Sequence, residues 1–474
     1  MNDDLMLAVD LPATAIPDHT LAPDIVILAA GESTRMRSKT PKVLHPLAGR
    51  PLIEYSVRLA ESLSPRLPTV VVGRNAEALQ AQIGDRAGYV HQQQRLGTGH
   101  AVLQARPLLL GHSHTVLVFY ADMPLVTLAS MQALLALHQR NQASGGVLTL
   151  LTFESDTPRG FGRIVRSAAG QVLAIVEEAD CTAEQLEITE LNPGLYCYDA
   201  DWLWRSLDEI TVSPKGEYYL TDLVAIAVQQ GCPVLAHRVS HPVEMMGINT
   251  RVHLAEAEAV LRARINRRWM EAGVTIVDPA TTYIEDTVEI GRDTLLLPGV
   301  HLRGQSKIGE DCCIGPDTTI IDTTIGAACR VQYAVLEDTL LEDQVDVGPF
   351  AHLRARAHLA TGVHMGNFGE VKNSYLGPGA KMGHFSYVGD ADIGQEVNVS
   401  AGVITCNYDG VRKNRTTVGD YAFIGSDTML VAPVTIGAGA RTGAGSVVTH
   451  DVPPGRLAVG VPARLRPPSE TQGE

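Results

Sequence analysis

The sequence predicts an α/β chain with an N-terminal Rossmann-like domain, a linker helix and a C-terminal left-handed parallel β-helix of hexapeptide repeats. Residues 24–30 form a continuous aliphatic run that ends at Gly31, as a buried parallel strand does before a loop. A helical pattern follows near residue 250, and aliphatic–glycine pairs then recur, often six residues apart or at a multiple of six. The chain has 474 residues, too many for one hydrophobic core, so at least two domains are expected.

The repeated pairs indicate why the second half should coil. An aliphatic residue at every sixth position can point inward only if each hexapeptide forms one flat side of a triangular coil, and stacked coils then share one core. The pairs are Ile308-Gly309, Ile314-Gly315, Met382-Gly383, Val388-Gly389, Val418-Gly419, Ile424-Gly425 and Ile436-Gly437.

Changes in the hydrophobic pattern of the sequence indicate where the domains and the linker should begin and end. Apolar residues at helical spacing predict an amphipathic linker helix that ends at Gly273; they are Leu254, Leu261, Ile265 and Trp269. Its arginines are interpreted as a solvated face. The expected parts are a mobile N-terminal tail (1–23), the first domain (24–249), the linker helix (250–273) and the β-helix with a C-terminal tail (274–474).

Net charge and cysteine content limit the classes of binding partner and the cellular compartment that we expect. A formal net charge of -15 argues against a broad nucleic-acid surface and favours small anions bound at local basic sites. Seven cysteines without a C-x-x-C pair match neither a disulfide framework nor a zinc site and indicate a reducing cytoplasm. The chain shows no basic n-region and no uncharged apolar run of spanning length. We therefore expect a cytoplasmic protein with no nucleic-acid or membrane partner.

Loops of the first domain carry residues suited to a polyphosphate and a metal ion. Gly31 lets the backbone approach a phosphate, while Arg35 and Lys42 supply positive charge. A second small-residue loop, LGTGHA at 96–101, opens a helix and suits a base or ribose. Asp122 follows another buried strand, at the edge where open α/β sheets bind ligands, and a carboxylate there is a natural Mg²⁺ ligand. The alternatives are a solvated basic loop and, for Asp122, a helix N-cap.

The order of the motifs points to one family. The motifs are LAAGxxTRM, PKVLHPLAG, LGTGHA, YADMPL, FGRI, IVEEAD, LNPGLY, GEYYLTD and GINTR. Joined to a hexapeptide domain, they resemble the bifunctional bacterial N-acetylglucosamine-1-phosphate uridyltransferases/glucosamine-1-phosphate N-acetyltransferases, over nearly the whole chain beyond the tail. The resemblance implies a uridyltransferase (nucleotidyltransferase) domain followed by an acetyltransferase β-helix. It also implies Mg²⁺ as cofactor and UTP, acetyl-CoA, glucosamine-1-phosphate and N-acetylglucosamine-1-phosphate as substrates; hexapeptide prisms usually form homotrimers.

In the first domain, the resemblance implies four groups of site residues. They are Gly31, Arg35 and Lys42 for the triphosphate, Gln92, Gly97 and Thr98 for uracil, Asp122 and Asn249 for Mg²⁺, and Gly162, Glu177 and Asn192 for the N-acetylglucosamine moiety. Structural alternatives remain for the last group, namely a turn at Gly162, a solvated strand end at Glu177 and a turn former at Asn192.

In the β-helix, the resemblance makes His384 the catalytic histidine. Glucosamine-1-phosphate would contact Arg354, Lys372, Tyr387 and Asn398, and the acetyl-CoA cleft would include Ala401, Asn407, Tyr408, Ser426 and Ala444, with Asn407 and Tyr408 also beside the sugar. A neutral histidine suits amine acetylation, which needs a base as the nitrogen attacks the thioester. The alternatives are a surface histidine in a turn and, as nucleophile, Cys406, which has no base nearby in the sequence.

The chain departs from the family pattern at four positions. Ser33 replaces a second glycine, Arg95 stands where glutamine is common, Pro193 interrupts Asn-Thr-Gly, and Gly460 stands where an arginine helps to hold CoA. Arg464 or Arg466, near the C-terminus, could replace the arginine that is missing at Gly460.

The main hypothesis is synthesis of UDP-N-acetylglucosamine, a precursor of cell wall and lipopolysaccharide, by acetylation and then uridylyl transfer. The alternative enzyme is a single-function sugar-1-phosphate nucleotidyltransferase whose β-helix only trimerises or regulates, and a third hypothesis is a non-catalytic scaffold. A mere stalk has no use for Arg354, Lys372, His384 and Tyr387, and a scaffold none for Arg35, Lys42 and Asp122.

Overall fold

The computed structural model describes residues 22–31 and 34–466. The chain divides into two compact units, and the division falls between Glu258 and Ala259, within helix α9 (Arg251–Glu271). All but the last two residues of the expected N-terminal tail lie outside the described residues.

The first unit is built on a mixed sheet. Four parallel strands come first, in the order β5-β4-β1-β6, and β11 then pairs antiparallel with both β6 and β7. Beyond β7 the sheet forks into β10-β8-β9 and β12. The strands are β1 (Asp24–Leu28), β4 (Thr69–Val72), β5 (Gly88–His91), β6 (Thr115–Tyr120), β7 (Leu148–Glu154), β8 (Gly162–Arg166), β9 (Val172–Val176), β10 (Glu190–Asn192), β11 (Tyr196–Asp199) and β12 (Val234–Arg238).

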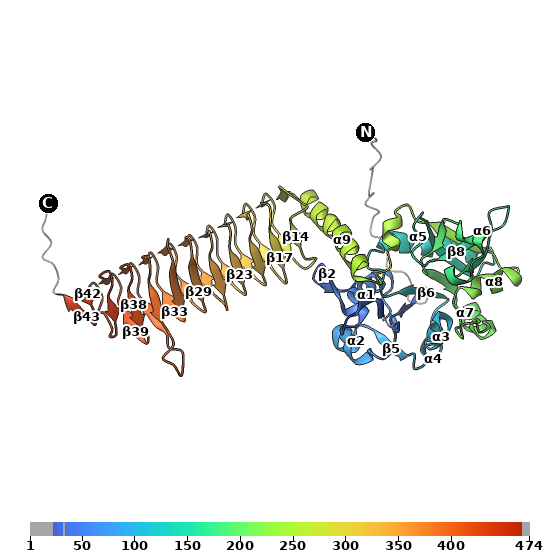
Figure 1. The fold of residues 1–474 in the computed structure, drawn as a ribbon, viewed down its shortest axis with the longest axis horizontal. Coiled ribbons are helices and arrows are strands. Elements are labelled where there is room, and N and C mark those ends of the chain that lie inside the picture. Colours follow the sequence, from blue (N-terminus) through green and yellow to red (C-terminus); the bar gives the residue numbers. More distant parts are fainter. Residues whose placement is uncertain (1–21, 32–33, 467–474) are drawn as a thin grey trace, which may run out of the picture. The chain divides into compact units, whose positions relative to one another are not determined.

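Helices cover both faces of this sheet (Figure 1). Strand β1 alternates between two cores, because Val26 and Leu28 join one and Ile25 and Ile27 the other, which explains its uninterrupted aliphatic sequence. Helices α3, α4, α7 and α8 contribute to the first core and α1, α2 and α5 to the second. Their bounds are α1 (Leu52–Leu63), α2 (Ala76–Ile83), α3 (Thr98–Leu103), α4 (Arg106–Leu109), α5 (Leu128–Gln142), α6 (Ala183–Leu186), α7 (Ala200–Ser206) and α8 (Asp222–Gln229). Among the described residues, no helix is long and apolar enough to cross a membrane.

The second unit is a parallel β-helix whose coils stack in register (Figure 1). Short strands from β13 (Thr275–Ile276) onward form three sheets, and each coil adds one strand to each sheet. Partners such as Leu302 and Ile320 lie 320 − 302 = 18 residues apart, or three hexapeptides, and both are fully buried. The predicted fold class is therefore confirmed.

Two features interrupt the regular coils. The segment 407–415 between β35 (Ile404–Cys406) and β36 (Thr416–Val418) stands out as a hairpin (Figure 1), held by a bridge between Tyr408 and Lys413. At the C-terminal end, β42 (Leu457–Gly460) and β43 (Ala463–Arg466) form an antiparallel hairpin.

The second half of α9 packs on the first coil. Arg262 lies over the Tyr283 ring, 4.4 Å from its centroid, and Tyr283 stacks on His301 at 4.6 Å. The Asn266 amide, which is fully buried, donates to the carbonyls of Pro279 and Thr282 at 3.0 and 3.1 Å. The helix thus covers the N-terminal end of the β-helix.

Candidate active sites

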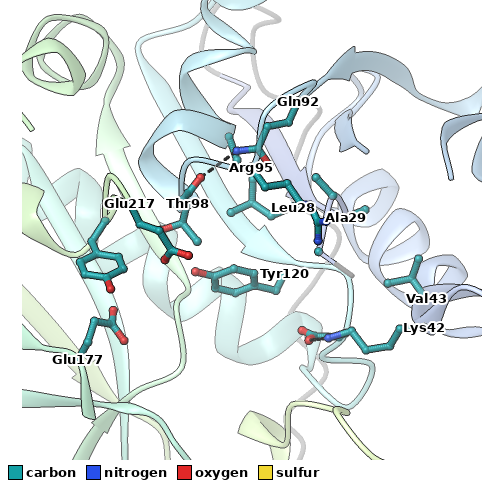
Figure 2. Close-up of a pocket in the computed structure, with 16 residues that line it drawn as sticks. Leu28, Ala29, Lys42, Val43, Gln92, Arg95, Thr98, Tyr120, Glu177 and Glu217 are labelled. Atoms are coloured by element: carbon teal, nitrogen blue, oxygen red, sulfur yellow. Dashed lines mark hydrogen bonds and ion pairs between the residues drawn. The ribbon is translucent and has the colours of Figure 1, made fainter. Parts of the chain in front are cut away.

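A cavity of about 490 Å³ lies at the carboxyl ends of β1 and β6 (Figure 2). Parallel pairing aligns Leu28 with Tyr120, so the loops that follow these two strands start at the same edge of the sheet. The predicted residues that line the cavity are Gly31, Lys42, Gln92, Gly97, Thr98, Asp122 and Glu177.

Four predicted residues form a charged cluster beside this cavity. The Lys42 ammonium pairs with the Asp122 carboxylate and donates to Oδ1 of Asn249 at 3.1 Å. Arg35 Nη2 donates to the same Asn249 oxygen at 3.1 Å. The Lys42 and Asp122 side chains are only 11% and 19% exposed, so their pairing is shielded from solvent. Asp122 is not a helix cap, because Thr127 caps the following helix α5.

The LGTGHA loop is fixed by hydrogen bonds to the segment 218–220. Tyr218 donates its backbone N–H to the Leu96 carbonyl at 2.7 Å and accepts from the Gly99 N–H at 2.9 Å. The backbone N–H of Leu220 donates to Thr98 Oγ1 at 3.0 Å. The Gln92 amide nitrogen, buried behind the loop, donates to the Gly97 carbonyl at 2.9 Å.

The predicted sugar-contacting residues lie close together, and Figure 2 shows one of them, Glu177, across the cavity from Lys42. Asn192 pairs with Gly162 in the β10–β8 ladder, and a Cβ atom on Gly162 would lie 3.7 Å from Glu177 Oε2. Burial raises the pKa of Glu177, and the Thr221 hydroxyl, which donates to its Oε1 at 3.0 Å, opposes that shift. Neither a solvated strand end for Glu177 nor a simple turn for Gly162, the first residue of β8, describes these positions. Asn192 also accepts from the Gly194 N–H, as a turn former does.

Sequence analysis missed three side chains that line the cavity: Tyr120, Glu217 and Tyr219. Figure 2 shows the Tyr120 ring between the carboxylates of Glu177 and Glu217 on one side and Lys42 on the other. Burial and then the charges of Glu177 and Asp122 raise the pKa of Tyr120, so it stays a neutral phenol. All three lie in motifs quoted above, YADMPL and GEYYLTD, which could have identified them.

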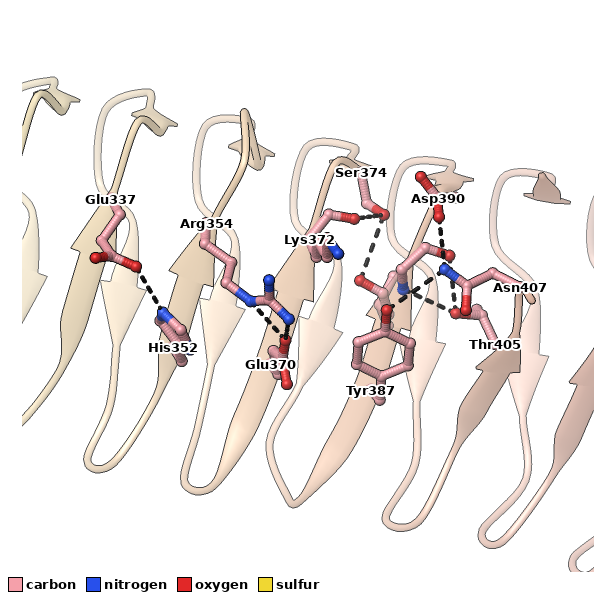
Figure 3. A network of polar contacts seen from close by, with 12 residues as sticks. Glu337, His352, Arg354, Glu370, Lys372, Ser374, Tyr387, Asp390, Thr405 and Asn407 are labelled. Carbon is pink, nitrogen blue, oxygen red and sulfur yellow. Dashed lines mark hydrogen bonds and ion pairs between the residues drawn. The ribbon is translucent and has the colours of Figure 1, made fainter. Parts of the chain in front are cut away.

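In the β-helix, predicted residues line up on the outer face of one sheet (Figure 3). Arg354, in β26 (His352–Arg354), is the register partner of Lys372, in β29 (Gly369–Lys372). Arg354 forms an ion pair with Glu370 at 2.6 Å. The nearby ammonium of Lys413, followed by Arg354, lowers the pKa of Lys372. Three cations therefore converge on one surface, and Lys413 is a residue that sequence analysis missed.

Tyr387 lies beside this group, on the next coil. It is the register partner of Glu370, and its hydroxyl accepts from the Asn407 amide at 3.4 Å. Asn407 also donates to Asp390 at 2.6 Å, which fixes the start of the 407–415 hairpin (Figure 3). Tyr408, further along that hairpin, is exposed.

His384 is exposed at a corner between two sheets, in a column of small residues. Its neighbour Phe385 accepts from the Gly402 N–H, Ala401 accepts from Asp427, and Ser426 accepts from Gly445. These bonds stack His384, Ala401, Ser426 and Ala444 in the same corner of successive coils.

The same corner is aromatic in the preceding coils. Tyr333, Phe350 and Phe368 stack with ring centroids 5.6 and 5.1 Å apart, and Phe385 continues the series; we call these four residues the aromatic ladder. Their exposed fractions are 39%, 55%, 60% and 56%.

A second cavity, of about 390 Å³, adjoins the small-residue corner and is lined by Ser426 and Ala444. Asn398, in β34 (Asn398–Val399), donates to Ser400, which also lines it. Burial raises the pKa of Cys406, so this thiol is a poor nucleophile and the general-base hypothesis for His384 is favoured.

The four departures fall in different places. Arg95 lines the first cavity, and Pro193 lies in the turn between β10 and β11. Gly460 has a positive φ of 103° at the C-terminal hairpin, where Arg466 pairs with the cavity residue Leu457 and Arg464 with Val459. Ser33 lies outside the described residues.

Comparisons with known proteins match both units. Residues 25–187 match the MobA-like NTP transferase domain, and residues 287–322 and 415–450 match the bacterial transferase hexapeptide (six repeats). The bifunctional protein GlmU of Heliobacterium modesticaldum is 49% identical over 435 residues, which cover 92% of this chain and 94% of that protein. The protein of the same name from Enterococcus faecalis is 45% identical with the same coverage. A structure of UDP-glucose pyrophosphorylase complexed with UDP-glucose covers 52% of this chain and 100% of its own, but 20% identity and a TM-score of 0.41 are too weak to add to this.

Gly97 should not tolerate a side chain. Its φ is +101°, and an added Cβ would overlap the Tyr218 carbonyl oxygen. We expect Gly97→Ala to lower the free energy of unfolding by roughly 3 kcal/mol, from backbone strain together with the clash. Gly111→Ala is the matched control, because Gly111 has a φ of +78° with open space around it; it should cost only about 1 kcal/mol. Equal costs in urea unfolding would contradict the role of the Tyr218 contact.

Proposed function

The chain belongs to the family of bifunctional GlmU proteins, which confirms the resemblance of its motifs, and we propose that it makes UDP-N-acetylglucosamine at two separate sites. The β-helix transfers an acetyl group from acetyl-CoA to glucosamine-1-phosphate. The first unit then transfers uridylyl from UTP to N-acetylglucosamine-1-phosphate and releases pyrophosphate. The observation that carries the proposal is that two polar clusters, one in each unit, each contain cations suited to a phosphate.

We assign uridylyl transfer to residues 24–249 and acetyl transfer to residues 274–474, with 250–273 as the linker. UTP and acetyl-CoA are substrates of the cytoplasm, where we place the protein. Its product would supply cell-wall and lipopolysaccharide synthesis.

Mg²⁺ fits the oxygen donors of Asp122 and Asn249. Both oxygens accept a hydrogen bond from the Lys42 ammonium. A carboxylate oxygen and an amide oxygen therefore already surround one positively charged group. The described residues contain no group of three His, Cys, Asp or Glu side chains suited to a metal, which agrees with an ion that takes few protein ligands and completes its shell with phosphate and water. When bound, the ion neutralises charge on the phosphates.

Positioning dominates the proposed uridylyl transfer. The sugar phosphate oxygen attacks the α-phosphorus of UTP in line, and the bond to pyrophosphate breaks. Arg35 and Lys42 offset the triphosphate charge, the loop at Gly97 and Thr98 holds the base, and Glu177 orients the sugar.

In the acetylation, three cations hold the sugar phosphate on the β-helix: Arg354, Lys372 and Lys413. His384 accepts a proton from the amine as its nitrogen attacks the thioester, and it passes that proton to the departing CoA thiolate, which leaves as the thiol. No acyl-enzyme forms. Ala401, Ser426 and Ala444 leave space along the corner for acetyl-CoA.

We also infer a homotrimer in which neighbouring β-helices complete the acetylation clefts. The aromatic ladder supports this, because it is an exposed apolar strip that leads to the corner of His384. Burial against a second copy would remove it from water.

One assay separates the bifunctional enzyme from the single-function alternative. The protein is incubated with glucosamine-1-phosphate, acetyl-CoA, UTP and Mg²⁺, each component is omitted in turn, and products are identified by mass. A single-function nucleotidyltransferase would make UDP-N-acetylglucosamine only from pre-acetylated sugar phosphate.

Asp122→Ala should lower uridylyl transfer by at least about 10²–10³-fold, because it removes a metal ligand and leaves Lys42 without its charged partner. Acetylation should be unchanged. Asp201→Ala, at an exposed carboxylate in α7, is the control and should transfer uridylyl normally. Pyrophosphate release with UTP and Mg²⁺ measures the effect, and near-normal release by Asp122→Ala would refute the assignment.

His384→Ala should lower acetyl transfer by about 10²–10⁴-fold, the usual effect of losing a positioned general base. Uridylyl transfer to N-acetylglucosamine-1-phosphate should stay near wild type. His364→Ala, at another exposed histidine of the β-helix, should acetylate normally. Release of free CoA thiol reports the rate, and unchanged release by His384→Ala would remove this residue from the mechanism.

The double variant Phe350→Ser/Phe368→Ser should weaken the trimer and reduce acetylation with it. Each buried phenyl ring contributes roughly 1.5–3 kcal/mol. Tyr421→Ser removes an aromatic side chain that is 62% exposed outside the aromatic ladder, and it should remain trimeric. Light scattering measures the mass; a stable trimer in the double variant would exclude the ladder as the interface.

A further inference from the structure

The first two turns of α9 contact the loops that carry the predicted triphosphate ligands. Arg251 Nε donates to the Met36 carbonyl at 3.3 Å, and Arg251 Nη1 lies 3.5 Å from His45 Nδ1. The Glu258 carboxylate accepts from the backbone N–H of Ala48 at 2.8 Å. These residues all belong to the first unit, which ends at Glu258. The start of α9 is therefore part of this unit and not only a connection.

A short path joins Glu258 to Lys42. Lys42 opens a 3-10 turn, η2 (Lys42–Leu44), and its carbonyl accepts from the His45 N–H at 3.2 Å. The chain then forms the two-stranded hairpin of β2 (Pro46–Leu47) and β3 (Arg50–Pro51). Ala48, at the tip of this hairpin, is buried and has a positive φ of 43°, a conformation that a residue with a side chain rarely adopts. The N–H at this strained position is satisfied because it donates to the Glu258 carboxylate.

We propose that Glu258 is a positioning residue for uridylyl transfer, acting through the hairpin at 46–51 to hold the Lys42 ammonium in place. The inference rests on the proposed function of the first unit. A charged acceptor binds a backbone N–H more strongly than a neutral one, and here the bond is partly buried. Arg251 contacts the same segment at His45, so α9 contacts it at two points, His45 and Ala48.

Glu256 is a matched control on the same turn of α9. Its carboxylate pairs with Arg159 at 2.8 Å, but the two side chains are 39% and 38% exposed. Exposed ion pairs contribute little because water and salt screen them. Arg159 also lies in the loop before β8, whose first residue is Gly162, and not in the segment that leads to Lys42.

The experiment compares kinetics and Mg²⁺–UTP binding of full-length variants. Glu258→Ala should raise the KM and Kd for UTP about tenfold, the effect of losing a hydrogen bond to a charged group. Its KM for N-acetylglucosamine-1-phosphate and its acetylation rate should stay within about twofold of wild type. Glu258→Gln, whose amide oxygen can still accept from Ala48, should show a smaller rise of roughly threefold. Glu256→Ala should bind UTP as wild type does.

A double-mutant cycle with Lys42→Ala tests the route. If Glu258 acts through Lys42, Glu258→Ala should weaken UTP binding no further once Lys42 is gone. The inference would be overturned if the losses of UTP affinity in the two single variants were additive, or if Glu258→Ala left the Kd for UTP unchanged. It would also be overturned if Glu258→Ala raised both KM values equally and lowered the unfolding temperature. If the wild type binds UTP without transferring uridylyl, the proposed function fails, while the binding cycle still decides the role of Glu258.

Discussion

Parallel strand pairing in fixed register is the constraint on which both sites depend. In the first unit it aligns the ends of β1 and β6, so that the loops that carry Gly31 and Asp122 begin at the same edge of the sheet. In the β-helix it sets Arg354 against Lys372 on the outer face, while their neighbours Leu353 and Val371 meet in the core. A slip of one residue would exchange these two faces and bury charge, so the aliphatic core also enforces the arrangement of the polar groups.

The repeated coil lets the surface change while the core stays the same. Each corner position recurs once per coil, and one corner changes from the aromatic ladder to the small residues Ala401, Ser426 and Ala444. Bulky rings suit burial against another surface, whereas small side chains leave a recess. The 407–415 hairpin then adds Lys413 beside Lys372 without disturbing the strands on either side.

Much of this could be predicted because it is encoded locally. The aliphatic run at β1, the periodicity of α9 and the hexapeptide pairs each determine their own element. The strand and loop pattern was enough to suggest Lys42 for phosphate and Asp122 for a metal ion, but Asn249, far away in the sequence, was suggested only by the order of motifs.

Other contacts had no local pattern to reveal them. Lys413 reaches its place through an inserted hairpin, and Glu258 faces Ala48 through the docking of a helix on a distant loop. Periodicity shows which side chains point outward, but not which outward side chains meet. Such contacts depend on tertiary packing.

The pairing of Lys42 with Asp122 has a consequence for substrate binding under the proposed function. Both groups are shielded, and removing one partner from a shielded pair leaves an uncompensated charge. A triphosphate that engages Lys42 alone would leave Asp122 without a counter-charge, and a cation that engages Asp122 alone would leave Lys42 without one. Asn249 accepts from Lys42 and Arg35 at one oxygen, so a substrate that engages these two cations would also change the hydrogen bonds of Asn249. Under the proposed function, binding of the nucleotide and of the divalent cation would therefore be coupled, because each would supply the charge that the other removes.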